Sequence, residues 1–216
     1  MLLSLDVGFR NMGWSLFDDQ EQGLIDCGVI TTKKSQDKKV RYTDDYFTNS
    51  QELFQGLSEL VEKNAPIAII GELPHGGGQN ARALAQMMSA VSIVSGVSFY
   101  HDILTAWCSP ADVKVAVTGK KSATKLEIML AIAEKFNIPV KTRKIGCRKT
   151  KKFKDGFRTE HRFVFKDTLL NEGRFEHIAD SCGAYLALRN SPICTLARNL
   201  TRKDSDFRFK REARAA

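Results

Sequence analysis

The chain has 216 residues, 43% of them hydrophobic, which suits one domain with a buried core. We find no run of about 18 apolar residues, and the N-terminus enters a strand pattern without a charged leader. We therefore expect neither a membrane span nor a signal peptide. The five cysteines include no C-x-x-C pair, which favours free thiols over a zinc site or disulfide framework. These features predict a cytoplasmic protein, or one of the host cytoplasm if the chain is viral.

The formal net charge is +8, and the excess positive charge is concentrated in two segments. Residues 141–166 carry eleven Lys or Arg against two acidic residues, and residues 198–214 carry seven against three. Such concentration is typical of a protein with a polyanionic partner. The structural alternative is a solvated basic loop and tail. Neither segment has the wide apolar face that a membrane surface would require.

The first part of the chain predicts three strands and a helix. Residues 2–6 form a buried strand pattern, and residues 11–17 and 23–32 suit two further strands of an antiparallel meander. Gly8 and Gly13 mark the expected turn region. A Lys-rich loop then precedes an amphipathic helix over about 44–63.

Strands and helices alternate after that helix. A strand is predicted over 66–72, then a glycine-rich loop, a helix from a cap at Gln79 or Asn80 to about Val94, and a strand over 103–108. The helix is rich in small residues, which favours either close helix packing or a symmetric dimer interface. These two explanations stay open.

Two further helices precede the basic segment. Ser109 and Pro110 predict a helix cap, with a short helix through Val115. A longer helix opens after Ser122, covers about 124–136 and ends at Asn137 and Pro139. The basic segment, with two glycines and alternating phenylalanines, predicts a hairpin or a loose excursion.

The last predicted helix covers 175–188. A basic tail follows, whose composition also suits disorder. This order of elements predicts an α/β domain with a mixed sheet flanked by helices. We place the domain at 1–190, with a basic excursion at 141–166, and the tail at 191–216.

Four ionisable residues lie where metal ligands would be expected. Asp6 and Glu72 each end an apolar strand, and His177 and Asp180 share one face of a helix. A carboxylate beside a core is costly unless it is paired or metal-bound. Each residue alone is explained equally well as a cap or a surface group, so the joint arrangement carries the argument. If the strands are neighbours, the acids converge in a way that suits Mg²⁺, two-metal sites and phosphodiester chemistry. His177 would bind one ion or carry a proton.

Several motifs resemble the RuvC-type Holliday junction resolvases. Ser4-Leu-Asp6-Val-Gly8-Phe-Arg10-Asn11-Met-Gly13-Trp14 resembles their first strand and turn, and the Arg10-Asn11 pair is closer to the viral, phage and mitochondrial branch. The other matching segments are Ile69–Glu72 (second acidic strand), Asn80–Ala90 (dimerisation helix), Lys114–Lys125 (paired lysines) and His177–Tyr185 (last motif).

The resemblance implies a ribonuclease H-like fold with a five-stranded mixed sheet, whose first three strands are antiparallel and the rest parallel. It also implies a homodimer that depends on Mg²⁺ or Mn²⁺ and cuts four-way DNA junctions in pairs. Two ions per active site are expected, with no small-molecule cofactor and no membrane partner. The expected metal ligands are Asp6, Glu72, His177 and Asp180, which are catalytic together with Lys125. The expected DNA contacts are Arg10, His75, Gly76, Gly77, Lys114, Lys125, Lys149, Lys151 and Lys152.

Two departures from the family favour broader cutting of branched DNA. His75 stands where the bacterial enzymes carry an aromatic residue, and the basic excursion is longer than in those compact members. Two other classes are kept as alternatives. One is an architectural junction-binding protein without chemistry. The other is an actin-like ATPase, suggested by Asp6-Val-Gly8, although the chain lacks a second Asp-x-Gly hairpin.

Overall fold

The computed structural model describes residues 1–18, 23–33, 35–37, 39–73, 80–147 and 156–200. Within them the chain forms a five-stranded sheet in the order β3-β2-β1-β4-β5 and a three-stranded sheet in the order β6-β7-β8. The strands are β1 (Leu2–Asp6), β2 (Asn11–Phe17), β3 (Leu24–Thr31), β4 (Ala68–Glu72), β5 (Leu104–Cys108), β6 (Val140–Gly146), β7 (Phe157–Phe165) and β8 (Thr168–Asn171). The helices are α1 (Tyr42–Asn64), α2 (Ala81–Tyr100), α3 (Pro110–Thr118), α4 (Lys125–Lys135) and α5 (Glu172–Leu188).

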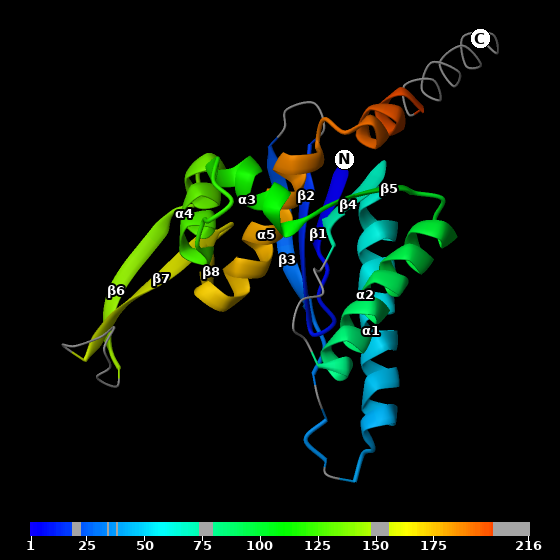
Figure 1. Ribbon diagram of the computed structural model, residues 1–216, viewed down its shortest axis with the longest axis horizontal. Coiled ribbons are helices and arrows are strands. Elements are labelled where there is room, and N and C mark those ends of the chain that lie inside the picture. Colours follow the sequence, from blue (N-terminus) through cyan, green and yellow to red (C-terminus); the bar gives the residue numbers. More distant parts are fainter. Residues whose placement is uncertain (19–22, 34, 38, 74–79, 148–155, 201–216) are drawn as a thin grey trace.

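The five-stranded sheet is mixed and covered on both faces (Figure 1). β1, β2 and β3 pair antiparallel, whereas β1, β4 and β5 run parallel. Side chains alternate along β1, so that Leu3 and Leu5 pack in one cluster with α1 and α2. Leu2 packs on the other face in a cluster with α4 and α5. This arrangement confirms the predicted α/β fold with a five-stranded mixed sheet.

Capping side chains fix where α3 and α4 begin. Ser109 and Asp112 form a reciprocal capping box, with Pro110 in the first turn of α3, as predicted. The following helix starts later than expected, because Thr124 is its N-cap and forms the second capping box with Glu127. Lys125 is therefore the first residue of α4.

Close packing holds α5 against β1 and β2. A Cβ added to Gly13 would lie 2.1 Å from the carbonyl oxygen of His177, so only glycine allows this approach. Gly13 therefore lies inside β2, not in a turn as predicted. The hydroxyl of Ser4 donates to the carbonyl of Ser181 at 2.6 Å, and the Ser181 hydroxyl donates to that of Ser15 at 3.0 Å. These buried contacts fix the helix that carries His177.

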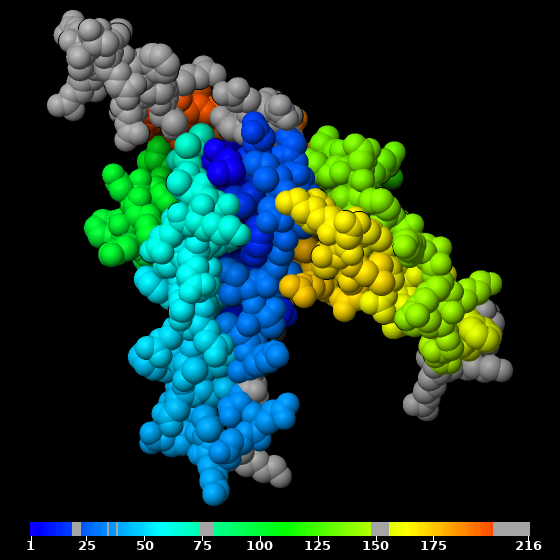
Figure 2. All heavy atoms as spheres, turned by 180° about the vertical axis from the view of Figure 1, so that it is seen from behind, coloured from blue at the N-terminus to red at the C-terminus, as the bar shows by residue number. Residues whose placement is uncertain are grey.

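The basic excursion forms regular structure, which we call the arm (β6, β7 and β8). The prediction of a hairpin is confirmed for β6 and β7, and the third strand, β8, was not predicted. Phe163 of β7 stacks on Phe175 of α5 with ring centroids 3.8 Å apart, which fixes the base of the arm. The arm then extends away from the five-stranded sheet, on the side opposite the α1–α2 pair (Figures 1 and 2).

The helix α2 is longer and more apolar than the sequence analysis expected. Its 20 residues include an 18-residue window with mean hydropathy 1.4, of which 22% is buried. By length and composition alone this helix could cross a membrane, and the prediction that the protein has no membrane span stays a prediction. One such helix is a weak indication of a membrane span. What the structure does establish is a long apolar surface on α2.

The beginning of the basic tail is helical. Residues 192–200 form a helix, and Cys194 and Ala197 are buried in the same core cluster as α5. The sequence left open whether the tail is ordered, and this part of it is helical. Residues 201–216 lie outside the described part of the chain.

Candidate active site

The C-terminal ends of β1 and β4 bring two carboxylates together. These strands are parallel neighbours, and their register pairs Asp6 with Glu72. Both side chains are half-buried. Asp6 and Glu72 point to the face covered by α5, since they alternate with Leu5 and Gly71. The two predicted acidic strand ends therefore meet at one edge of the sheet.

The first half of α5 adds an imidazole and a third carboxylate. His177 Nδ1 lies 2.7 Å from Asp6 Oδ2. Asp180 lies nearly one turn further along and is half-buried, like Asp6. Asn171 caps the helix by accepting a hydrogen bond from the Arg174 amide. The structure thus gathers the four residues that the sequence analysis singled out.

The pKa values reflect how crowded these acidic groups are. Burial, together with the charges of Asp180 and Asp6, raises the pKa of Glu72 to about 8. Burial and the charges of Asp6 and Glu176 raise the pKa of Asp180 to about 7. The hydrogen bond to Asp6 raises the pKa of His177. The cluster therefore binds protons that isolated carboxylates would release.

The donor set fits a hard divalent cation. Among the described residues, no three His, Cys, Asp or Glu side chains are already closed around a single point. However, burial and, to a smaller extent, neighbouring carboxylates raise the pKa values of Glu72 and Asp180, and a bound cation would relieve the repulsion between the carboxylates. Carboxylate oxygens are the ligands that Mg²⁺ and Mn²⁺ prefer. The site is an open acidic cluster that would have to contract around an ion.

Two predicted lysines, on the helices α3 and α4, interact electrostatically with this cluster. The charge of Lys114 on α3 offsets part of the rise in the pKa of Glu72, and that of Lys125 on α4 offsets part of the rise in the pKa of Asp180. Lys125 also donates a hydrogen bond to Glu176 on α5. Both ammonium groups therefore lie within electrostatic reach of the carboxylates, and their role near a scissile phosphate stays a prediction.

Arg10 is engaged inside the protein. Its guanidinium donates to Asn49 Oδ1 at 2.6 Å and to Asp45 Oδ2 at 3.3 Å, both on α1. Asp45 in turn accepts a hydrogen bond from the Ser35 amide at 2.6 Å. These contacts tie the turn after β1 to α1, and a DNA contact from Arg10 stays a prediction.

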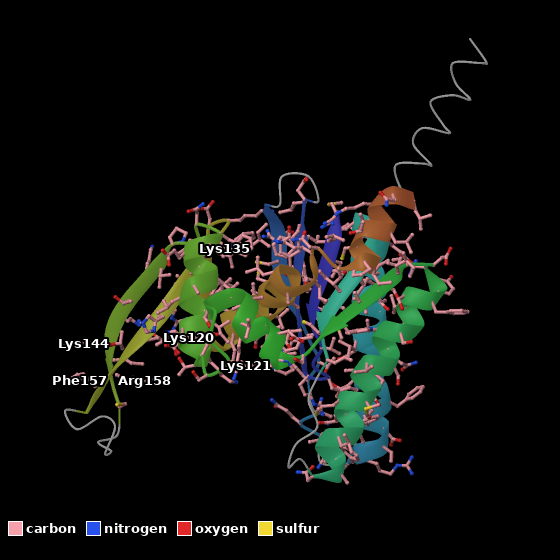
Figure 3. The ribbon with its side chains drawn as sticks, turned by 45° about the horizontal axis from the view of Figure 1, so that its top comes forward. Lys120, Lys121, Lys135, Lys144, Phe157 and Arg158 are labelled. Carbon is pink, nitrogen blue, oxygen red and sulfur yellow. The ribbon has the colours of Figure 1, made fainter. Side chains whose placement is uncertain are left out.

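The other predicted DNA contacts cannot be placed. They lie outside the described residues and remain predictions: His75, Gly76, Gly77, Lys149, Lys151 and Lys152. Other cations are placed that the sequence analysis did not single out. Lys120 and Lys121 lie in the connection between α3 and α4, and Lys144 and Arg158 lie towards the far end of the arm (Figure 3).

Two hollows flank the N-terminal half of α5. One, of about 390 Å³, is lined by Asn11, Val29, Thr31, Gly173, Arg174, Glu176 and His177. The other, of about 470 Å³, is lined by Lys125, Leu126, Met129, Arg158, Thr159, His161, Glu172 and Glu176. Glu176 contributes to both. The sequence analysis missed this residue, although its spacing of four from Asp180 places it on the same helix face.

Comparison with curated proteins supports the resemblance read from the motifs. The chain is 24% identical over 130 residues to the crossover junction endodeoxyribonuclease RuvC of Salinibacter ruber, covering 59% of this chain and 68% of that protein. It is 28% identical over 130 residues to RuvC of Methylococcus capsulatus, covering 59% and 72%. No protein-family profile matches the sequence.

Solved structures share the fold. RuvC of Thermus thermophilus in complex with a Holliday junction substrate aligns with a TM-score of 0.57 and 15% identity, covering 86% of this chain and 90% of that one. The yeast mitochondrial Holliday junction resolvase aligns with a TM-score of 0.55 and 12% identity, covering 87% and 77%. The chain therefore has the ribonuclease H-like fold of these proteins. Its resemblance to RuvC-type resolvases, inferred from the motifs, is confirmed in both sequence and fold.

Proposed function

We propose that this protein is a divalent-metal-dependent endonuclease that resolves Holliday junctions and cuts other branched DNA. The observation that carries the proposal is the meeting of Asp6, Glu72 and Asp180, with His177, at one edge of a ribonuclease H-like sheet. The relatives named crossover junction endodeoxyribonucleases, and the structural neighbour in complex with a Holliday junction, support this substrate class.

The metal ions would be held by the acidic cluster. Asp6, Glu72 and Asp180 would be the carboxylate ligands, with His177 as a fourth ligand or a proton carrier. When bound, two Mg²⁺ or Mn²⁺ ions supply Lewis-acid stabilisation of phosphate charge and a water of lowered pKa. His177 Nδ1 faces Asp6, which leaves Nε2 free to exchange a proton with a bound group.

Cationic groups around the cluster would hold the DNA. Lys114 and Lys125 would contact phosphates next to the bond that is cut, since each acts electrostatically on a cluster carboxylate. Further out, the arm exposes Lys141, Arg143 and Lys144, and a shallow hollow of about 290 Å³ lies beside the first two. This surface would bind a DNA arm through its phosphates, without reading its sequence.

A homodimer would place two such sites on one junction. One face of α2 is exposed over its whole length and carries no charge: Ala81, Leu84, Ala85, Met88, Ser92, Ser95, Gly96 and Phe99. Phe99 is 89% exposed. Small and apolar residues spaced three and four apart suit close packing against a second helix.

The dimer proposal has a direct test at Gly96. A Cβ added there meets no atom within 4 Å, so a larger side chain is tolerated by the single chain. Gly96→Arg is expected to convert a dimer into a monomer in sedimentation velocity. The control is Gln51→Arg on exposed α1, which adds the same charge and leaves the assembly unchanged. Dimers that persist in Gly96→Arg, or a monomeric wild type, would contradict an α2 interface.

The endonuclease proposal is tested by cleavage of defined substrates. Four-way, three-way, flap and linear duplex DNA would be incubated with the purified protein in Mg²⁺ and, separately, in EDTA. We expect paired cuts in the four-way junction and weaker cutting of the other branched forms, all abolished by EDTA. Binding of junctions without cutting under any metal would instead favour the architectural protein. Tight ATP binding, with no cleavage, would favour the actin-like alternative.

A further inference from the structure

Glu176 lies between the acidic cluster and the lysine that would face the DNA. It precedes His177 on α5 and lies one turn before Asp180. Its carboxylate accepts a hydrogen bond from the Lys125 ammonium, which reaches across from α4. The side chain of Glu176 is 26% exposed, whereas that of Lys125 is 75% exposed. The pair therefore joins a fixed carboxylate to a long side chain at the edge of the site.

Neither residue is well placed for the stability of its own helix. Lys125 is the first residue of α4, where the helix dipole disfavours a positive charge. Glu176 and Asp180 are like charges four residues apart, a spacing that destabilises a helix. Pairing with each other satisfies both groups. The stability of α4 alone would favour a residue other than Lys125, and that of α5 alone a residue other than Glu176. We therefore attribute the two residues to the contact that they make with each other between the helices.

The surroundings of Glu176 connect the site to its DNA-facing surface. Glu176 lines both hollows beside α5, one of which also contains Arg174 and the other Lys125 and Arg158. Glu176 therefore lies where the two hollows meet. A phosphate that entered the second hollow would meet the ammonium of Lys125 there.

We propose that Glu176 is a positioning residue that holds Lys125 beside the acidic cluster before DNA binds; the inference rests on the proposed endonuclease function. A lysine ammonium has three N–H donors, and the bond to Glu176 uses one of them. The other two remain for a phosphate. Glu176 thus fixes a flexible cation in place without blocking it.

The expected effect follows from the freedom of the lysine side chain. A lysine loses rotamer freedom when it is fixed, and an exposed ion pair offsets only part of that loss. Ordering Lys125 before the reaction therefore corresponds to roughly three- to fivefold in rate. Without Glu176, Lys125 would be ordered only in the transition state. Loss of Glu176 should therefore lower the rate of cutting more than it lowers DNA affinity.

The test is a double-mutant cycle in single-turnover cleavage of a four-way junction with Mg²⁺. Glu176→Gln is expected to cut about three- to fivefold more slowly, with junction affinity measured in Ca²⁺ unchanged from wild type. The double variant Glu176→Gln/Lys125→Ala should cut no more slowly than Lys125→Ala alone, because the carboxylate acts through the lysine. Glu172→Gln is the matched control: this residue lies one turn earlier on α5 and pairs with His161.

Three outcomes would overturn the proposal. Losses that multiply in the double variant would give Glu176 a role independent of Lys125. A large drop in Mn²⁺ affinity in Glu176→Gln, measured by calorimetry, would make the residue a metal ligand. An equal loss in Glu172→Gln would point to general disturbance of α5.

A second measurement separates failure of this inference from failure of the proposed function. In metal-free protein, ¹⁵N NMR should detect a slowly exchanging Lys125 ammonium that disappears in Glu176→Gln and persists in Glu172→Gln. This readout requires no cleavage. If wild-type protein cuts nothing but shows the ammonium signal, the proposed function fails while the pairing stands. If the protein cuts junctions but the signal is absent, the positioning role fails alone.

Discussion

The acidic cluster and the cationic surface are held in different ways. The carboxylates are positioned by the backbone. The strand register pairs Asp6 with Glu72, and close packing at Gly13 determines how near α5 lies to the sheet. The cations instead lie on α3, at the start of α4 and on the arm, and exposed ion pairs orient two of them, Lys125 and Arg143. Exposed pairs contribute little energy and weaken with salt. The comparison predicts an acidic site that is sensitive to packing and a DNA surface that is sensitive to ionic strength.

The largest effect is expected from removing one carboxylate of the cluster. Asp6→Asn keeps the shape of the side chain but removes the charge that a cation requires. We expect the cleavage rate to fall by at least about 10³-fold, since the chemistry relies on charge stabilisation at this point. Junction affinity in Ca²⁺ should stay within a few-fold of wild type. Cutting at the wild-type rate would remove Asp6 from the catalytic site.

Packing of α5 gives the next effect. In Gly13→Ala the new methyl would lie 2.1 Å from the His177 carbonyl, so α5 has to shift. We expect the free energy of unfolding in urea to drop by about 2–4 kcal/mol, with loss of cleavage. Gly146→Ala in β6 is the control, because its methyl meets nothing within 4 Å and should leave the free energy of unfolding within about 0.5 kcal/mol of wild type. Equal stability of Gly13→Ala and wild type would show that α5 does not depend on this contact.

The raised pKa values predict how the stability of metal-free protein depends on pH. Burial and neighbouring carboxylates raise the pKa of Glu72 to about 8 and that of Asp180 to about 7, so the folded protein binds more protons than the unfolded chain between about pH 4.5 and 8. Stability therefore falls as pH rises through this window. His177 has the same sign, since its pKa is also raised.

Urea unfolding in EDTA at pH 5.5 and pH 8.5 would check this linkage. Glu72→Gln should reduce the difference in the free energy of unfolding between pH 5.5 and pH 8.5 by on the order of 2 kcal/mol. Added Mn²⁺ should stabilise the protein more at pH 8.5 than at pH 5.5, because the ion displaces protons from the same groups. A profile that rises with pH over this range would contradict the crowded cluster.

The smallest effect is expected on the arm. Replacing Lys144 and Arg158 with alanine removes two cations from its far end (Figure 3). We expect junction affinity to fall several-fold at low salt and the slope of log affinity against log salt to decrease by about 2. The control pair Lys63→Ala/Lys135→Ala removes two cations at the ends of α1 and α4. An unchanged slope in the arm variant would mean that the arm does not contact phosphates.

Strand patterns and capping residues predicted most of the fold. Residues 2–6 and 11–17 match β1 and β2, because a buried apolar run and an alternating one are strong local signals. The prediction for α2 stopped near Val94, six residues short, because small residues give a weak amphipathic pattern. The third strand of the arm was missed because β8 is only four residues long.

The carboxylates of the site were easier to predict from the sequence than the residues that position them. Asp6 and Glu72 end apolar runs, where a charge is conspicuous. Gly13 was taken for a turn residue, since its actual reason, close approach of α5, is a long-range contact that no local pattern encodes. Glu176 was missed for the same reason: its partner Lys125 is 51 residues away in sequence.

The most direct test of the central claim is a crystal structure of the protein soaked in Mn²⁺, with anomalous scattering used to locate the ion. The account predicts an anomalous peak bound by the carboxylates of Asp6, Glu72 and Asp180, with these side chains drawn closer together than in the open cluster. A structure in which they remain apart and hold no ion at saturating Mn²⁺ would contradict it.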